Sequence, residues 1–253
     1  MTPISIDGTD ITGATIDGTD VQEITVDGDV VFSAVPTVPQ ANLFNYDAKA
    51  LSLSNGASVS SWNDLSTRGA NLSIASGSPT FEATGLDGQP CVRYDGSDDR
   101  HESSGISVSS PGRGVFYGVF QTFQFGTGSG SARFERSINI ENTLSGINEI
   151  KLESNFGLLT SGNFFSGSSL STSSRTFKVV FDASNSSIQV DGGTVTNGTL
   201  SSANYGDISI GARFENDLFD DMKLGQFVGY LNPSSQTETD AEAALSAKWG
   251  VTF

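Results

Sequence analysis

The sequence predicts an all-β protein: a jelly-roll sandwich with one C-terminal helix, preceded by a small β-meander. Three observations predict this fold class. Short segments of alternating polar and apolar residues recur along the chain, turns rich in Gly and Ser separate them, and the N-terminus repeats with a period of ten residues. With 253 residues, of which 36% are hydrophobic, the chain is long enough to bury the core of one large sandwich.

The N-terminal repeat has three copies, residues 4–11 (ISIDGTDI), 14–21 (ATIDGTDV) and 24–31 (ITVDGDVV). Each copy sets Asp-Gly between alternating segments, which indicates a hairpin because Gly accepts a positive φ without penalty. Such a small unit cannot bury a core alone, so we expect it to dock on the following domain, another copy of the chain or a larger particle. The side chains expected to make this assembly contact are Ile6, Ile16, Val26, Val30 and Phe32.

The chain divides into three parts. Residues 1–33 form the repeat, and residues 34–40 (AVPTVPQ) form an extended linker because two prolines stand close together. Residues 41–253 form one jelly-roll domain, in which segments such as 114–120 (GVFYGVF) and 176–181 (TFKVVF) are expected strands.

A helix is expected near the C-terminus. Ser235 and Glu238 have the spacing of a capping box, apolar residues follow at helical spacing, and Gly250 stands where a C-terminal cap belongs. Residues 251–253 are expected to resume as a short strand.

The charge balance is strongly acidic, with 29 Asp and Glu against 13 Lys and Arg and a net charge of −16 at pH 7. This charge repels phosphates, so nucleic acid is not an expected partner. The acids are scattered, which argues against a disordered acidic arm. Asp-rich, Lys-poor surfaces resemble those of proteins from very salty environments, which favours a halophilic source over the alternative of an ordinary acidic surface protein. No apolar run approaches the roughly 18 residues of a membrane span, and the first residues do not resemble a signal peptide.

The single cysteine, Cys91, excludes an intrachain disulfide and is expected to be a buried, inert thiol. With one Cys and one His, a single chain cannot build a Cys/His zinc site.

Three segments occur in a characteristic order: residues 43–48 with 56–64 (LFNYDA, GASVSSWND), residues 79–99 (PTFEATGLDGQPCVRYDGSDD) and a helix end at 247–250 (AKWG). Together they resemble the LamG-like, concanavalin A-like lectin/glucanase superfamily, over roughly residues 40–253. The resemblance implies a concanavalin A-like jelly roll but says little of function, because this fold hosts lectins, glycosidases, adhesins and structural modules. The N-terminal repeat also looks like segments of structural proteins of haloarchaeal viruses and phages.

Catalytic motifs are weak. A glycosidase needs two carboxylates, one as acid and one as nucleophile or base. The family's hydrolases that carry these groups on a single strand place acids at alternating positions, with a third acid after them. Here only Glu215 and Asp217 alternate, and no third acid follows. The only imidazole, His101, lies in a polar segment without a Gly-x-Ser-x-Gly motif, so we expect a solvated loop histidine. On this basis the chain is expected not to be an enzyme.

Asp95, Asp98 and Asp99 are candidate calcium ligands, since hard cations prefer clustered oxygen donors. The favoured alternative is an Asp95-Gly96 turn with the other two acids hydrated; no other cofactor is expected. Trp62 and Trp249 could stack on sugars, but the resemblance implies that both pack in the core.

The leading functional hypothesis is a virion structural protein on the particle surface, such as a tail fibre, baseplate, spike or turret protein, with a role in host attachment. It would form a homo-oligomer, a trimer or pentamer, and contact other virion proteins and host-surface glycans. The alternative is a secreted or surface carbohydrate-binding module, followed by a glycoside hydrolase.

Overall fold

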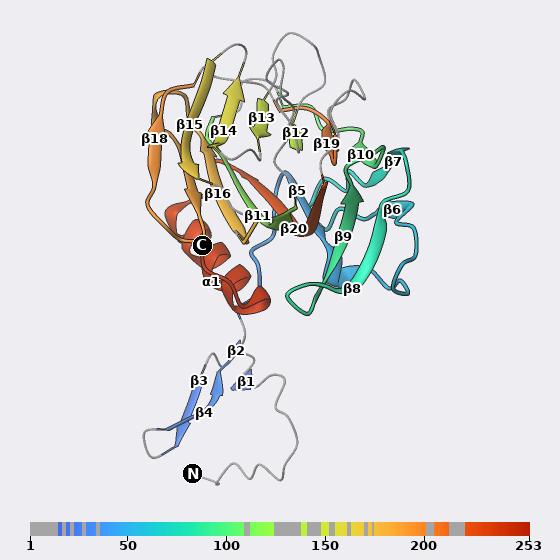
Figure 1. The fold of residues 1–253 in the computed structure, drawn as a ribbon. Coiled ribbons are helices and arrows are strands. Elements are labelled where there is room, and N and C mark those ends of the chain that lie inside the picture. The colour runs from blue at the N-terminus through green and yellow to red at the C-terminus, as the bar shows by residue number, and fades with distance from the viewer. Residues whose placement is uncertain are drawn as a thin grey trace.

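The structure is a computed structural model of residues 1–253. It describes residues 36–108, 112–123, 172–173, 175–200, 205–212 and 221–253 in full, and the backbone alone of strands between 15–33 and between 138–169. Within these ranges the chain is an all-β sandwich with one C-terminal α-helix, as the sequence predicts (Figure 1).

The second and third copies of the N-terminal repeat each form a two-stranded antiparallel hairpin. Strands β1 (Thr15–Ile16) and β2 (Thr19–Asp20) flank one Asp-Gly pair, and β3 (Glu23–Val26) and β4 (Asp29–Ser33) flank the next. These positions agree with the turn chemistry of Asp-Gly. The first copy, with Ile6, lies outside the described residues, as do the side chains of Ile16, Val26, Val30 and Phe32.

The first sheet has the strand order β18-β17-β16-β11-β20-β9-β8, and β5 also pairs with β20. All of its pairings are antiparallel, and some join strands that are far apart in the sequence, such as β11 with β20 and β5 with β20. Its strands are β5 (Phe44–Asp47), β8 (Thr80–Leu86), β9 (Gln89–Asp95), β11 (Gly114–Thr122), β16 (Thr176–Phe181), β17 (Ser186–Val190), β18 (Thr196–Gly198) and β20 (Asp221–Leu231).

The second sheet has the order β15-β14-β13-β12-β19-β10-β7-β6 and is also antiparallel. Its strands are β6 (Ser61–Trp62), β7 (Leu72–Ser76), β10 (Arg100–Ser103), β12 (Ile138–Ile140), β13 (Asn148–Lys151), β14 (Asn155–Thr160), β15 (Asn163–Ser169) and β19 (Ile208–Ile210). Short 3-10 helices, η1 (Ala48–Ala50) and η2 (Ala183–Asn185), follow β5 and β16.

An aromatic core fills the space between the two sheets. Phe116 of β11 has Phe44 and Tyr205 as ring neighbours, at centroid distances of 5.7 and 5.5 Å. Phe227 of β20 lies 4.5 Å from Phe44, and Trp62 of β6 is fully buried. Aromatic rings bury large areas, so this cluster provides much of the hydrophobic stabilisation of the sandwich.

Helix α1 (Ser235–Trp249) covers part of the outer face of the first sheet (Figure 1). Glu238 accepts hydrogen bonds from Arg113 and forms an ion pair with Lys178, whose ammonium nitrogen lies 3.1 Å away. Gly250 ends the helix in the left-handed conformation, as predicted.

Two details at this end of the chain differ from the sequence prediction. The N-cap is Ser234, whose hydroxyl accepts a hydrogen bond from Thr237 N at 3.0 Å, and not Ser235. Glu238 does not complete a capping box because its carboxylate instead contacts Arg113, just before β11, and Lys178 of β16. Residues 251–253 form no strand; the Thr252 carbonyl accepts a hydrogen bond from the Thr176 hydroxyl instead.

None of the helices in the described ranges combines the length and apolar character that crossing a bilayer requires.

Candidate functional site

One register row crosses the second sheet on its outer face. Glu102 of β10 pairs with Ser73 of β7 on one side and with Ser209 of β19 on the other. Ser209 pairs with Asn139 of β12, which in turn pairs with Glu149 of β13. Directly opposed residues of neighbouring strands share a face, so these residues define a polar row.

One step along β10 and β19, the paired residues His101 and Ile210 are fully buried and face the core. In the register, Ile138 pairs with Ile210 and Ile150 pairs with Ile138. Successive residues of a strand lie on opposite faces, so an apolar inner row requires the polar row to lie outside. In the described part of this outer face the Glu102 side chain is 28% exposed, whereas Ser209 beside it is fully buried, so the face is open at Glu102 and closed at Ser209.

The register of the polar row continues across all eight strands. The same register begins at Ser61 of β6, and beyond Glu149 it ends in two apolar residues, Leu159 of β14 and Phe164 of β15. Five strand spacings separate Glu102 from Phe164, which corresponds to about 24 Å. The row thus places hydroxyl, amide and carboxylate residues in its middle and an aromatic residue at its end.

Glu102 is the best-defined charged residue of the row. Its carboxylate lies 3.2 Å from the guanidinium of Arg100, whose side chain is only 7% exposed. Burial raises the pKa of Glu102; Arg100 opposes this shift and the nearby Asp207 reinforces it. Ser209 beside it is fully buried, with its hydroxyl donating to the Ala212 carbonyl at 2.6 Å. This part of the outer face is therefore shielded from water, in contrast to a flat solvated surface.

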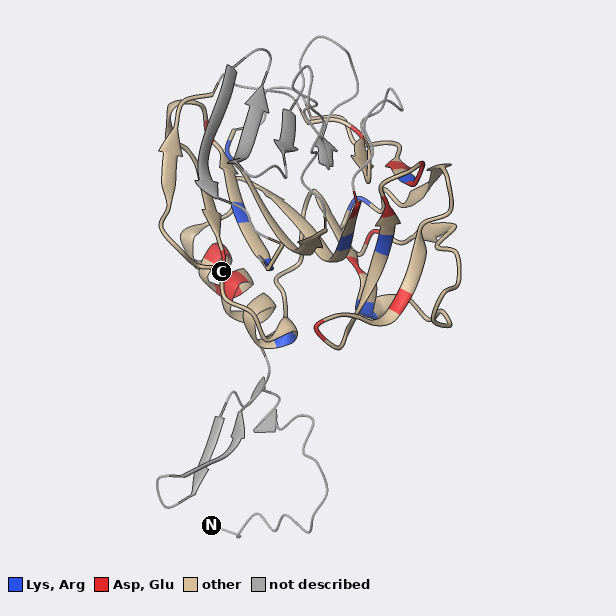
Figure 2. Cartoon of the chain, viewed as in Figure 1, with Lys and Arg blue, Asp and Glu red and all other residues tan. Residues whose placement is uncertain are grey.

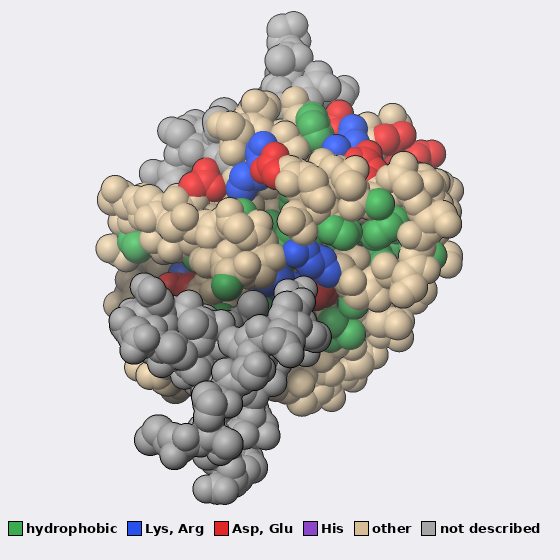
Figure 3. Space-filling model, turned by 90° about the horizontal axis from the view of Figure 1, so that it is seen from below, with side chains coloured by type: hydrophobic (Ala, Val, Ile, Leu, Met, Phe, Trp, Pro, Cys, Tyr) green, Lys and Arg blue, Asp and Glu red, His purple; other side chains and the backbone are tan. Residues whose placement is uncertain are grey.

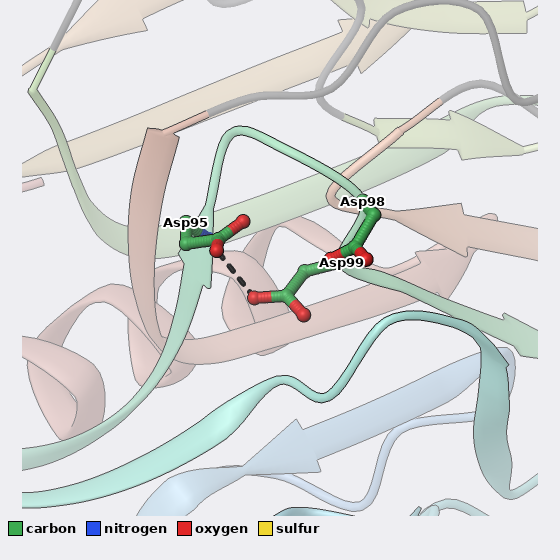
Figure 4. A group of neighbouring side chains, drawn as sticks. All are labelled: Asp95, Asp98 and Asp99. Carbon is green, nitrogen blue, oxygen red and sulfur yellow. Dashed lines mark hydrogen bonds between the residues drawn. The ribbon is translucent and has the colours of Figure 1, made fainter.

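Asp95, Asp98 and Asp99 do lie together, at the loop between β9 and β10 (Figure 4). One oxygen of each lies within 4.8 Å of the others. The loop itself already uses several of these oxygens: Asp99 accepts hydrogen bonds from Ser78 N at 2.6 Å and Asp95 N at 3.0 Å, and Asp95 accepts one from Ser97 N at 2.8 Å.

These hydrogen bonds explain the acidic cluster by turn formation. Gly96 has a φ of +77°, as an Asp-Gly turn requires, and Asp98 is exposed. Asp99 differs from the expected hydrated residue, since it is only 5% exposed and fastens the loop before β8. Calcium takes six to eight oxygen ligands, and Asp221, the residue opposite Asp95 on β20, is ion-paired with Arg93.

His101 is not the solvated loop residue that the sequence predicts. It belongs to β10 and is fully buried between the sheets. Its Nε2 lies 2.6 Å from the Val59 carbonyl and must carry the proton, so Nδ1 accepts the hydrogen bond from the Tyr94 hydroxyl at 2.7 Å. Burial lowers its pKa to about 4, against the opposing effect of the Val59 hydrogen bond. Its role in the structure is to link the two sheets.

The other single-residue predictions for the core are confirmed. Cys91 is fully buried, and burial followed by the charge of Glu82 raises the pKa of its thiol to about 12. Trp62 and Trp249 are 0% and 5% exposed, so neither offers a stacking surface to a sugar.

Among the described residues, Phe123 is the only aromatic side chain with substantial exposure, at 38%. Arg93 and Lys223 are opposed residues of β9 and β20, and both lie over its ring, at 4.8 and 5.1 Å from the centroid. Figure 2 shows basic and acidic positions on neighbouring strands at this end of the first sheet. Each cation also has an acidic partner, Asp221 and Glu82 respectively. Figure 3 shows similar groupings of basic and acidic side chains on the face seen from below. The cluster of Phe123, Arg93 and Lys223 stabilises the first sheet through ion pairs and cation–π contacts.

Glu215 and Asp217 lie outside the described residues. Sequence reasoning missed the polar row altogether, because its members come from strands that are distant in the chain. The available signal was the single polar residue at the centre of the segments INI and ISI, but their pairing partners could not be read from the sequence.

The sandwich belongs to a class of β-domains that also occurs in glycosidases. No protein-family model matches the sequence, and no curated protein matches it. A GH54 α-L-arabinofuranosidase is similar in structure, with a TM-score of 0.53 and 14% identity, over 75% of this chain and 51% of that one. An arabinofuranosidase complexed with arabinofuranosyl-α-1,2-xylobiose gives a TM-score of 0.52 at 15% identity, with the same coverage.

A Trypanosoma rangeli sialidase in complex with sialic acid gives a TM-score of 0.55 at 13% identity, over 90% of this chain and 36% of that one. The chain therefore spans about half the length of the arabinofuranosidases and about a third of the sialidase. At such identities the likeness shows the fold alone.

These comparisons correct two predictions. The virion structural role is wrong as the main interpretation, because the similar structures are glycosidases and they favour the carbohydrate-binding alternative. The expectation that the chain is not an enzyme is contradicted by the same finding, since the fold is one that glycosidases use.

Proposed function

We propose that this chain is a carbohydrate-binding β-sandwich domain that holds a saccharide along the polar row of the second sheet. The row itself is the observation that carries this proposal. Sugar hydroxyls donate and accept hydrogen bonds together, and the row holds the acceptor carboxylate of Glu102, with Asn139 and Glu149 at the register positions beyond Ser209. Phe164 at the end of the row adds the residue type on which a sugar ring stacks.

The length of the row supports an extended ligand. Because the row crosses strands at about 4.8 Å per step, a chain of several sugars could contact it while a single sugar would meet only two or three strands. The similar structures were solved with arabinofuranosyl-xylobiose in one case and sialic acid in another. Oligosaccharides that contain arabinofuranose, xylose or sialic acid are therefore the first ligands to test.

Binding should be measured by titration calorimetry of the full chain against these oligosaccharides, with and without Glu102→Gln. We expect the substitution to weaken binding about tenfold or more, since it removes a charged acceptor from a shielded hydrogen bond. Glu82→Gln is the matched control: Glu82 is an ion-paired outward residue of similar exposure, 30% against 28%, on the other sheet. Equal binding by both variants would contradict this site.

Glycoside hydrolysis is the second candidate function, favoured by one specific observation. The polar row holds two carboxylate residues, and burial raises the pKa of Glu102, as a general acid requires. Three strand spacings, about 14 Å between Cα atoms, separate Glu102 from Glu149. This backbone separation exceeds the carboxyl spacing of both retaining enzymes, about 5 Å, and inverting ones, about 6.5–9.5 Å, so it selects neither stereochemistry. Turnover that disappears in both Glu102→Gln and Glu149→Gln would establish hydrolysis at this row.

A further inference from the structure

We infer that Arg100 is a positioning residue for saccharide binding, which keeps Glu102 ionised and oriented toward the ligand. This inference rests on the proposed function. Arg100 itself does not reach the row as a ligand group, because its side chain is buried against the sheet and its guanidinium lies on the carboxylate of Glu102.

The surroundings of Glu102 make such a residue necessary. From β19 its neighbours are the buried Ser209 and, just before the strand, the carboxylate Asp207. From β7 it faces Ser73, which brings no charge. Partial burial and a nearby like charge both disfavour an ionised carboxylate. Within the described residues, Arg100 is the positive charge that opposes both of these effects on the Glu102 carboxylate.

The ionisation state matters because a carboxylate and a carboxylic acid offer different hydrogen bonds. The carboxylate of Glu102 can accept two hydroxyl donors at once, whereas the protonated form gives up one acceptor and adds a donor. A saccharide that places two hydroxyls on Glu102 will therefore bind the ionised form more tightly. Affinity should then follow the titration of Glu102, and Arg100 should set where that titration lies.

The test is calorimetric titration of the full-length protein with the best-binding oligosaccharide between pH 5 and pH 8. We expect Arg100→Met to bind about as well as the wild type at pH 8 and about tenfold more weakly at pH 5. Arg100→Lys restores a positive charge and should recover most of the loss. Glu102→Gln should bind weakly and with no pH dependence in this range.

A purely structural role for Arg100 gives a different pattern, because it would lower affinity equally at every pH. That pattern, or a pH profile unchanged from the wild type, would overturn the inference. If Arg100→Met does not fold, as judged by circular dichroism, Asp207→Asn decides the question. Removal of the like charge should strengthen binding at pH 5 relative to pH 8, and an unchanged ratio would again overturn it.

Failure of the proposed function looks different from failure of this inference. A wild-type protein that binds no saccharide at any pH removes the proposed function. A wild-type protein that binds, with a pH profile that neither Arg100→Met nor Asp207→Asn shifts, removes only the role of Arg100.

Discussion

At the scale of single residues, His101 makes stability depend on pH. The imidazole is neutral in the folded chain because it is buried, and burial lowers its pKa to about 4 from an ordinary value of 6.5. The unfolded chain therefore binds a proton more readily between these two values, and stability falls as the pH falls. The contribution of His101 is fully present above pH 6.5 and is lost progressively toward pH 4.

Comparison with His101→Gln isolates this effect, because an amide can also donate to the Val59 carbonyl and accept from the Tyr94 hydroxyl. We expect the wild type to lose about 2.5 kcal/mol of stability relative to this variant between pH 7.5 and pH 4.5. Urea unfolding followed by circular dichroism at the two pH values measures it. A difference between the two proteins that is equal at both pH values would show that His101 does not titrate on unfolding.

Asp64 is a second residue whose role comes from its hydrogen bonds. Its carboxylate accepts from Asn45 N at 2.8 Å, from Ala70 N at 2.9 Å, and from the backbone and hydroxyl of Ser66 at 2.8 and 2.7 Å. These bonds hold the loop before β7 against β5. An amide in its place presents two N–H groups toward these donors, so one oxygen site is lost.

We expect Asp64→Asn to lower the free energy of unfolding by about 2 kcal/mol or more, since at least one donor is left unsatisfied. Asp98→Asn is the control with the same change of charge at an exposed position, and should leave stability within about 0.5 kcal/mol of the wild type. Thermal unfolding of the three proteins side by side tests this, and similar midpoints for all three would refute the role assigned to Asp64.

At the scale of elements, the start of α1 depends on which serine caps it. The Ser234 hydroxyl accepts from Thr237 N, whereas Ser235 is already the first helical residue. We expect Ser234→Ala to cost about 1 kcal/mol and Ser235→Ala to cost close to nothing. Chemical denaturation of both variants distinguishes them, and an equal cost, or a larger cost for Ser235→Ala, would restore the capping box that the sequence predicts.

The elements themselves were largely predictable where the information is local. Residues 114–120 and 176–181 lie in β11 and β16, as predicted. Both segments are rich in β-branched and aromatic residues, which favour a strand through local preference alone. Gly250 marks the helix end by its own backbone preference. The predicted cap, Ser235, is one residue away from the observed cap, Ser234, because two adjacent serines carry the same local signal. The difference depends on the ion pairs of Glu238 with Arg113 and Lys178, which the local sequence does not reveal.

The candidate site could not be predicted, because it depends on long-range pairing. Glu102 meets Ser209 only when β10 and β19 pair, and Asn139 then joins from the middle of the chain. His101 was misjudged for the same reason: its polar neighbours in the sequence suggested a loop, but β7 and β19 on either side make it part of a buried strand. A one-residue shift in register would exchange His101 and Glu102 between core and surface.

At the scale of the whole molecule, the net charge of −16 opposes the compact state through self-repulsion. Salt screens this repulsion, since the Debye length falls from about 10 Å at 0.1 M to about 3 Å at 1 M. Salt also weakens the ion pairs that fasten α1, such as Lys178 with Glu242 at 2.6 Å. The two effects have opposite signs, and the better-shielded ion pairs are screened less than the exposed excess of acids.

We therefore expect the unfolding midpoint to rise by about 5 °C between 0.05 M and 2 M NaCl, which corresponds to between one and two kcal/mol for a chain of this size. Asp98→Asn combined with Asp240→Asn removes two exposed acids and should reduce the rise. Differential scanning calorimetry across the salt series measures both. A midpoint that falls with added salt would mean that local ion pairs, and not the net charge, dominate the electrostatic free energy of this fold.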